Sequence, residues 1–189
     1  MESALVVSTN EKIASILAET LLQLNIIRII TVTTAGEARR LLIERDYDLC
    51  VVNSPLIDET GENLARNIAS KGISQVLLLV RSEFYNEISH HVEDYGVITV
   101  AKPVNRDLLW SALKVAQAAH KKLQIVQNEN KLLLQKIEEI RIIDRAKCIL
   151  ISHFSMSEPE AHRCIEKQSM DMRTTKRAVA EEILKTYEN

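Results

Sequence analysis

Histidine side chains, which often serve as catalytic or metal-binding groups, are spaced here in a way that favours neither chemistry. His90 and His91 are adjacent, so on a helix they would point in different directions and would not bind one metal ion together. His120, His153 and His162 are isolated from one another and are expected at the surface. The sequence has no glycine-rich phosphate loop and no G-x-S-x-G nucleophile motif. We therefore predict no enzyme, no metal site and no cofactor.

The cysteines and the overall composition indicate a cytoplasmic protein. Cys50, Cys148 and Cys164 show no metal-ligand spacing, as is typical of reduced thiols. No run approaches the roughly 20 apolar residues of a membrane span, and the start of the chain does not resemble a signal peptide. With 46% apolar and 26% charged residues in a length of 189, we expect one or two ordinary globular domains and no membrane partner.

Short apolar runs alternate with helical patterns over residues 1–119. The runs predicted as strands are 4–7, 26–32, 49–52, 76–80 and 97–100. Thr34 to Glu37 is a capping box that begins one of the intervening helices. The alternation predicts an α/β fold, a five-stranded parallel doubly wound sheet with helices on both faces. Such sheets place their functional sites at the carboxyl ends of the strands.

The residues at those ends carry a resemblance to a known family. Val6-Val7, the strand from Tyr47 to Asn53, and Lys102-Pro103 resemble a response-regulator receiver domain, and the resemblance covers about the first 119 residues. In that family, two acids after the first strand and an Asp after the third bind Mg²⁺. The same Asp accepts a phosphoryl group.

The matching positions of this chain lack the groups for that chemistry. Ser8 and Thr9 stand in place of the two acids, and Asn53 stands in place of the phosphoacceptor. Val80 replaces the family's Ser or Thr, and only Lys102 is kept. An amide oxygen is a poor nucleophile, and Mg²⁺ is bound through at least one or two carboxylates. We expect this degenerate pocket to bind no Mg²⁺ and to accept no phosphate, so the domain would serve as an interaction platform.

A long proline-free and glycine-free stretch runs from Pro103 to Pro159 and predicts one unusually long helix, capped by Asn105. From Leu109 onward, apolar residues recur on the seven-residue repeat of a coiled coil. A single Asn at an a position favours an in-register parallel dimer. The alternative is one amphipathic helix packed on its own domain. The predicted dimer seam consists of Leu123, Val126, Asn130, Leu133, Ile137 and Ile140.

The remainder of the chain predicts a small three-helix bundle whose first helix continues the long one. Ser157 to Glu160 is a second capping box, residues 169–172 are expected to connect two helices, and Thr174 or Thr175 is expected to cap the last.

The resemblance of this part to a known family lies in segments 143–147, 149–150, 157–161, 168–171, Arg173, 179–180 and Ile183. Over roughly 45 residues they resemble the ANTAR domain of bacterial transcription antiterminators. Two positions depart from that family: Cys148 stands where Gly is usual, and Lys176 stands where an apolar residue is frequent. We therefore divide the chain into a receiver-like domain (1–119), a coiled-coil linker helix (109–140) and an ANTAR-like domain (124–185).

The resemblance implies binding to paired hairpins in an mRNA leader, which prevents a terminator hairpin from forming. Residues 120–189 carry a net charge of +2 against −4 for residues 1–119, so basic side chains are available there for phosphates and loop bases. The candidates for RNA contact are Arg145, Lys147, Arg163, Lys167, Gln168, Ser169, Arg173, Thr174, Lys176 and Arg177.

Two other functions stay open, a DNA-binding regulator and a scaffold that acts through protein contacts. No tight turn joins two helices with a recognition helix rich in Arg, Asn and Gln, which disfavours the first. With Asn53 in the pocket, a regulatory protein, a ligand or dimerisation itself would have to replace phosphorylation as the input.

Overall fold

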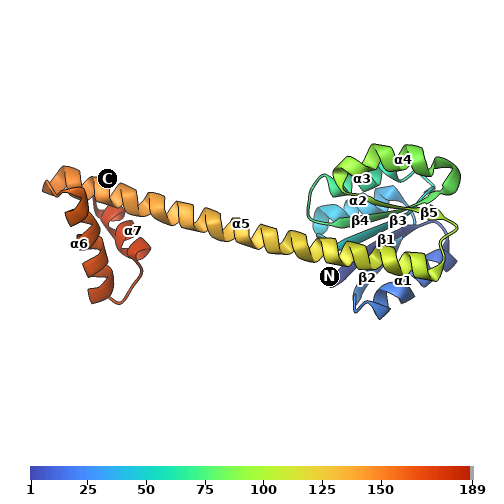
Figure 1. The fold of residues 1–189 in the computed structure, drawn as a ribbon, viewed down its shortest axis with the longest axis horizontal. Helices are drawn as coiled ribbons and strands as arrows, with labels where there is room; N and C mark the ends of the chain where they lie inside the picture. Colours follow the sequence, from blue (N-terminus) through green and yellow to red (C-terminus); the bar gives the residue numbers. More distant parts are fainter. Residues whose placement is uncertain (188–189) are drawn as a thin grey trace. The chain divides into compact units, whose positions relative to one another are not determined.

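A computed structural model describes residues 1–187, which fall into two compact units that meet in sequence between Gln124 and Ile125. The first unit is a five-stranded parallel sheet in the order β2-β1-β3-β4-β5, as Figure 1 shows. This arrangement confirms the predicted α/β fold. The strands are β1 (Ser3–Ser8), β2 (Arg28–Val32), β3 (Leu49–Asn53), β4 (Gln75–Arg81) and β5 (Ile98–Lys102). The connecting helices are α1 (Glu11–Gln23), α2 (Ala35–Glu44), α3 (Glu62–Ala69) and α4 (Tyr85–Val92), with short 3₁₀ turns η1 (Ser82–Phe84) and η2 (Glu93–Tyr95).

Two hydrophobic cores cover the two faces of this sheet because successive strand residues point to opposite sides. In β1, Ala4 and Val6 face α1 and the start of α5 (Arg106–Phe154). Leu5 and Val7 face α2, α3 and α4. All four side chains are fully buried. Burial on both faces explains why the strands read as continuous apolar runs, and it fixes their carboxyl ends at one edge.

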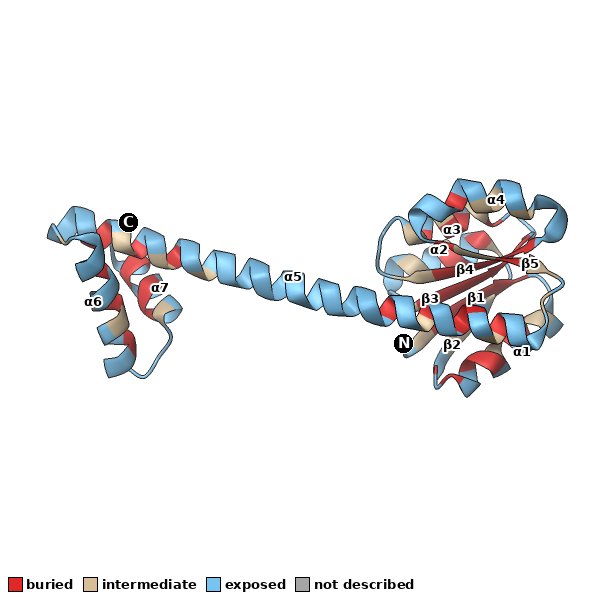
Figure 2. Ribbon diagram, viewed as in Figure 1, coloured by how far each residue is buried: buried red, intermediate tan, exposed pale blue. Residues whose placement is uncertain are grey.

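The helix α5 begins in the first unit and ends in the second, and Asn105 caps its start by accepting a 2.7 Å hydrogen bond from the backbone of Leu108. This confirms the long helix and its cap. Its first apolar residues, Leu109, Ala112 and Ala116, are buried against the sheet. Residues 121–138 are all exposed, as the unbroken pale blue of Figure 2 indicates. The seven-residue pattern therefore begins as packing within one chain and continues as an uncovered apolar stripe.

The second unit is a bundle of the end of α5 with α6 (Glu158–Asp171) and α7 (Lys176–Tyr187). Its core joins residues of all three helices, including Ala146, Ile165 and Ala180. Ser157 and Glu160 form the predicted capping box, and of the two candidate caps Thr175 is the one that accepts a bond from the backbone of Ala178, at 3.1 Å.

The prediction that residues 169–172 form a connection was wrong, since α6 continues through Asp171. The physical reason is that Ser169 extends the buried stripe of Ala161 and Ile165, four residues apart each time on one helix face. The connection to α7 is confined to the few residues that follow. Among the described residues, no helix is long and apolar enough to cross a membrane.

His120 was predicted at the surface and is instead 4% exposed, because it lies one turn beyond Ala116 on the face of α5 that packs on the sheet. Its Nε2 lies 3.4 Å from Oδ1 of Asp48, but neither ring nitrogen makes a hydrogen bond. Burial lowers the pKa of His120, the Asp48 carboxylate opposes this, and the N-terminal ammonium adds to the lowering. His120 is thus held neutral at the point where α5 leaves the sheet.

We expect acidification to loosen the first unit through this histidine. A lowered pKa means that the unfolded chain takes up the proton first, so stability is complete above pH 6.5 and is lost as the pH falls below it. The midpoint temperature of thermal unfolding should fall by a few degrees as the pH is lowered from neutral to well below 6.5. His120→Gln should remove that part of the pH dependence, whereas the exposed His90→Gln should retain it. Equal pH profiles for the three proteins would contradict the assignment.

Candidate functional site

Hydrogen bonds connect three residues of the predicted phosphoacceptor pocket at the carboxyl edge of the sheet. Asn53, at the end of β3, donates from Nδ2 to Oγ of Ser8 at the end of β1, over 3.0 Å. Lys102, at the end of β5, donates from Nζ to Oδ1 of Asn53 over 3.1 Å and also to the Ser54 carbonyl. Ser8 and Asn53 are 2% and 4% exposed, and these bonds give each buried polar side chain a partner.

The other two residues predicted at this pocket do not join the network. Thr9 is exposed at the start of the α1 segment, and Val80 is fully buried. Burial lowers the pKa of the Lys102 ammonium, and Arg81 adds to the lowering. Among residues 1–187, no three His, Cys, Asp or Glu side chains gather closely enough to hold a metal ion. The pocket thus presents an ammonium and neutral oxygens.

Three of the basic residues nominated for RNA contact are held in ion pairs within the second unit. Lys147 contacts Asp144 and Glu158, each at 2.9 Å, which raises the pKa of Lys147. Lys176 forms an ion pair with Glu166 at 2.6 Å, and Arg177 forms one with Glu181 at 2.7 Å. Lys176, which departs from the family's apolar preference, therefore ties α7 to α6.

Arg163 and Lys167 lie one turn apart on the face of α6 opposite its buried stripe, and we name this pair the α6 row. Both are exposed, and neither has an ion-pair partner among the described residues. Arg173 follows α6 with a positive φ of 51°, which turns the chain toward α7. The row and Arg173 are therefore basic groups open to a polyanion.

The remaining nominees are polar residues of the same segment. Gln168 and Thr174 are exposed. Ser169 is buried, and its hydroxyl donates to the Glu166 carbonyl over 2.7 Å. The Ser169 carbonyl in turn accepts a bond from the backbone of Thr174. Ser169 therefore serves the internal structure of the turn.

An open hollow on α5, which we name the α5 hollow, was not anticipated from the sequence. Arg141 and Arg145 lie one turn apart on it, with the small side chains of Cys148 and Ser152 further along the same face. Of its residues only Arg145 had been nominated. Their spacing of three or four residues was a signal in the sequence that could have identified this face of the helix. The full lining is Arg141, Asp144, Arg145, Cys148, Ile149 and Ser152.

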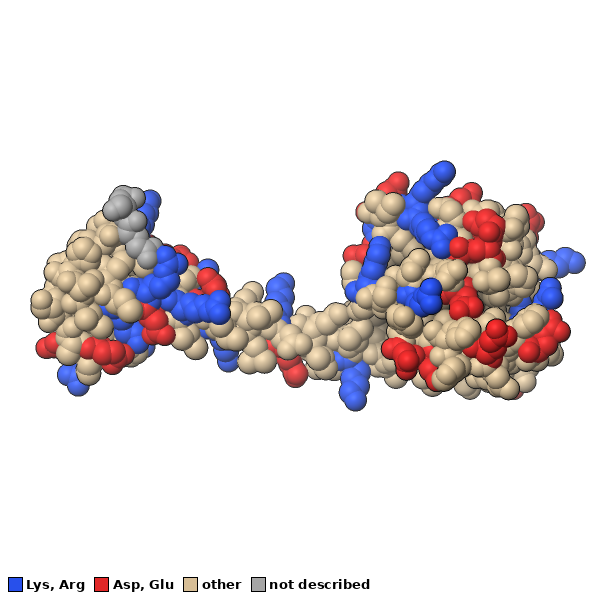
Figure 3. Space-filling view, turned by 90° about the horizontal axis from the view of Figure 1, so that it is seen from above, with Lys and Arg blue, Asp and Glu red and all other residues tan. Residues whose placement is uncertain are grey.

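The charges around this hollow favour an anionic partner. Asp144, its one acid, is paired with Lys147. The Glu181 carboxylate raises the pKa of the Arg177 guanidinium, and Glu138 and Glu139 of α5 add to the rise. Figure 3 shows the resulting concentration of Lys and Arg side chains on one side of this unit. Small side chains beside guanidinium groups allow close approach of a phosphate backbone.

The predicted seam residues are exposed. Leu133 is 56% and Ile140 58% exposed, and the other apolar seam residues are at least 37% exposed. Asn130, which precedes Leu133 in the repeat, is exposed as well. Leu132 is equally uncovered at a neighbouring position of the repeat. A row of large apolar side chains of this length is costly in water and favours coverage by a partner.

Both parts of the chain are similar to known proteins. The family model of the ANTAR domain matches residues 132–184. The transcriptional regulatory protein PdtaR of Mycobacterium tuberculosis is 28% identical over 140 residues, which cover 74% of this chain and 68% of PdtaR.

Solved structures match the first unit. The signal receiver domain of an HD domain-containing protein from Pseudomonas fluorescens superposes with a TM-score of 0.56 at 22% identity, covering 66% of this chain and 93% of that one. The response regulator TrrA from Thermotoga maritima gives a TM-score of 0.53 at 24% identity, covering 61% and 99%. These likenesses establish a receiver-like fold.

Proposed function

Because the chain joins a receiver-like domain to a C-terminal ANTAR domain, we propose that it is a transcription antitermination regulator that binds paired RNA hairpins as a homodimer. The observation that carries the proposal is the ANTAR match over residues 132–184. The similarity to PdtaR, a transcriptional regulatory protein, supports a regulatory role rather than a catalytic one. Binding to a leader hairpin would compete with the terminator hairpin of the same transcript.

The basic surfaces of the second unit support RNA as the partner. The α5 hollow presents two arginines, and the α6 row with Arg173 presents three further cations. Arginine binds phosphates in a bidentate manner and stacks on unpaired loop bases. We assign the main phosphate contacts to the α5 hollow, because a concave surface holds more of a backbone than the convex face of one helix. The α6 row adds weaker contacts.

The exposed apolar stripe of α5 supports the dimer. Burying one such side chain stabilises an assembly by about 2 kcal/mol, so a seam of this length is sufficient for association. Asn130 at an a position favours the parallel, in-register pairing. A parallel dimer presents two copies of the RNA-binding unit, which suits a target with two hairpins.

An electrophoretic mobility shift tests the RNA assignment. The full chain at micromolar concentration and low salt should retard an RNA with two hairpins of six-nucleotide loops, and should retard a duplex DNA of equal length less. Preference for the DNA would favour a DNA-binding regulator instead. Binding to neither would favour a scaffold that acts through protein contacts.

We further propose that the receiver-like domain accepts no phosphate in the usual pocket. Asn53 offers an amide that is already bonded to Ser8 and Lys102, and neither Ser8 nor Asn53 supplies a carboxylate for a metal ion. Treatment with acetyl phosphate and Mg²⁺ should leave the intact mass of the chain unchanged. Addition of one phosphoryl group, located by fragmentation to this pocket, would overturn the proposal.

A further inference from the structure

A cavity of roughly 310 Å³ lies at the carboxyl edge of the sheet, beside the Asn53–Lys102 network. Ser54 and Pro55, directly after β3, line it together with Arg81 at the end of β4. Phe84 and Ile88 line it from η1 and α4. Open parallel sheets bind small molecules at this edge, so the position favours a ligand site.

The lining combines both signs of charge with an apolar wall. Arg81 supplies a guanidinium, and Glu62 and Glu87 supply carboxylates. Pro55, Phe84 and Ile88 are the apolar members. We propose that this cavity binds a small zwitterion with an apolar body, such as an aromatic or branched α-amino acid. Its carboxylate would pair with Arg81, its ammonium with Glu87 or Glu62, and its side chain would lie on Phe84 and Ile88.

The charged groups are available for such a ligand. Arg81 contacts Glu83 at 3.5 Å, and both side chains are more than half exposed, so this pair is weak. Glu87 has no ion-pair partner among the described residues, and Glu62 contacts only the ring of His91, at 3.3 Å. A zwitterion would therefore replace a weak surface pair with two charge-assisted hydrogen bonds.

Hydrogen bonds link the cavity wall and its neighbours to β5, the strand that leads to α5. The Ser54 carbonyl accepts a hydrogen bond from Lys102, and Ser82 donates to the carbonyl of that lysine. On α4, Ser89 lies 2.8 Å, oxygen to oxygen, from Thr99 of β5. A ligand held between Ser54, Arg81 and α4 would thus lie beside residues that hydrogen-bond to both ends of β5, and it would act without phosphate chemistry.

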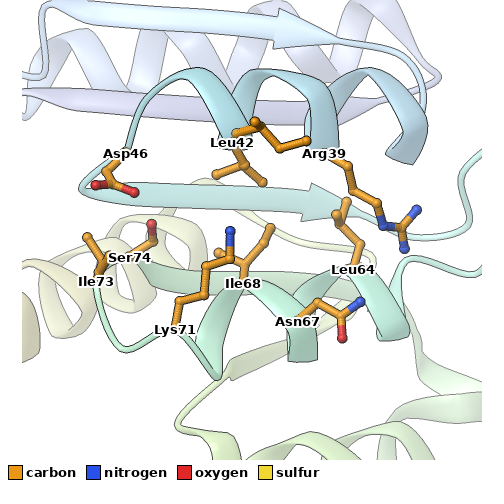
Figure 4. Close-up of a pocket in the computed structure, with 10 residues that line it drawn as sticks. Arg39, Leu42, Asp46, Leu64, Asn67, Ile68, Lys71, Ile73 and Ser74 are labelled. Carbon is orange, nitrogen blue, oxygen red and sulfur yellow. The ribbon is translucent and has the colours of Figure 1, made fainter.

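A second groove, between α2 and α3, fits a ligand of this class less well. Figure 4 shows Leu42, Leu64 and Ile68 between the two helices, with Lys71 at the rim. The groove reaches Asp46 and Ser74, which precede β3 and β4, so it lies toward the amino edge of the sheet. Its lining is mainly apolar, and Arg39 is held by Glu59 at 2.7 Å. The carboxyl-edge cavity is therefore the better candidate.

The test compares three probes that share one ring: phenylalanine, phenethylamine (the ammonium alone) and 3-phenylpropionate (the carboxylate alone). With the full chain and probes at about 5 mM, phenylalanine should raise the thermal midpoint and shift the backbone NMR signals of Ser54, Arg81 and Ile88. Leucine should do the same more weakly. Each single-charge probe should bind at least about tenfold more weakly.

Two variants and a control assign the charges. Arg81→Gln should weaken the binding of phenylalanine and 3-phenylpropionate but leave the binding of phenethylamine unchanged. Glu87→Gln should weaken the binding of phenethylamine but leave the binding of 3-phenylpropionate unchanged. Arg28→Gln, an exposed arginine on β2, should change none of them. Absence of binding by phenylalanine and leucine, or binding that is the same in all variants, would overturn the proposal. The outcome is independent of whether the chain binds RNA.

Discussion

Replacing Arg141 and Arg145 together by Gln is expected to lower the affinity for a paired-hairpin RNA about a hundredfold, since each lost phosphate contact costs about 1.4 kcal/mol. The salt dependence should weaken as well, with the slope of log K against log salt falling by about two. The loss should be similar for different loop sequences, because phosphate contacts carry no base information. Fluorescence titration at several salt concentrations measures both quantities.

The matched control is Lys185→Gln, an exposed cation of α7 outside both basic surfaces. It should leave affinity within about twofold of the original. Arg163→Gln combined with Lys167→Gln, the α6 row, should cost less than the hollow variant, about tenfold. If the α6 row costs more than the α5 hollow, RNA lies on the other face of the bundle and our assignment of the hollow is wrong.

Placing a charge in the seam is expected to separate the dimer. Leu133→Lys removes about 2 kcal/mol of apolar burial from each of two chains, which raises the dimer dissociation constant about a thousandfold. Binding to a paired hairpin should then weaken more than binding to a single hairpin, because two linked sites act together only in the dimer. Sedimentation velocity and paired titrations with both RNAs measure these effects.

Leu132→Lys is a close control, since Leu132 is next to Leu133 and 59% exposed but lies outside the a and d positions. It should remain dimeric. Asn130→Leu should instead change oligomeric state or register, since it removes the polar group that selects a parallel pair. Equal dissociation by the Leu132 and Leu133 variants would contradict a two-helix seam.

The sheet was predictable from sequence because both of its faces are buried. A continuous apolar run such as residues 76–80 is apolar on both faces of a strand, which predicts a strand buried on both sides. The structure has β4 at this position, and residues 76–80 are buried. The long helix was equally predictable from the lack of Pro and Gly. Pattern alone did not reveal that Leu109 and Ala116 pack within the chain whereas Leu133 does not, since the same repeat serves both roles.

The features that sequence did not reveal depend on contacts between distant residues. His120 is buried because α5 meets Asp48 of the β3 segment, 72 residues earlier in the chain. Ser169 looked available for RNA but is taken up by the end of α6. The sequence showed Lys102 without the acids of the receiver family, and only the folded edge of the sheet shows that its partners are Asn53 and the Ser54 carbonyl. The sequence showed which residues are charged, but it did not show which charged groups contact one another.

Native mass spectrometry of the full chain with one RNA that carries two hairpins tests the central claim most directly. We expect a complex of two chains and one RNA at micromolar concentration. A complex of one chain and one RNA should be less abundant than this complex. A monomer that binds the same RNA tightly would contradict the dimeric account, and absence of any complex would contradict RNA binding itself.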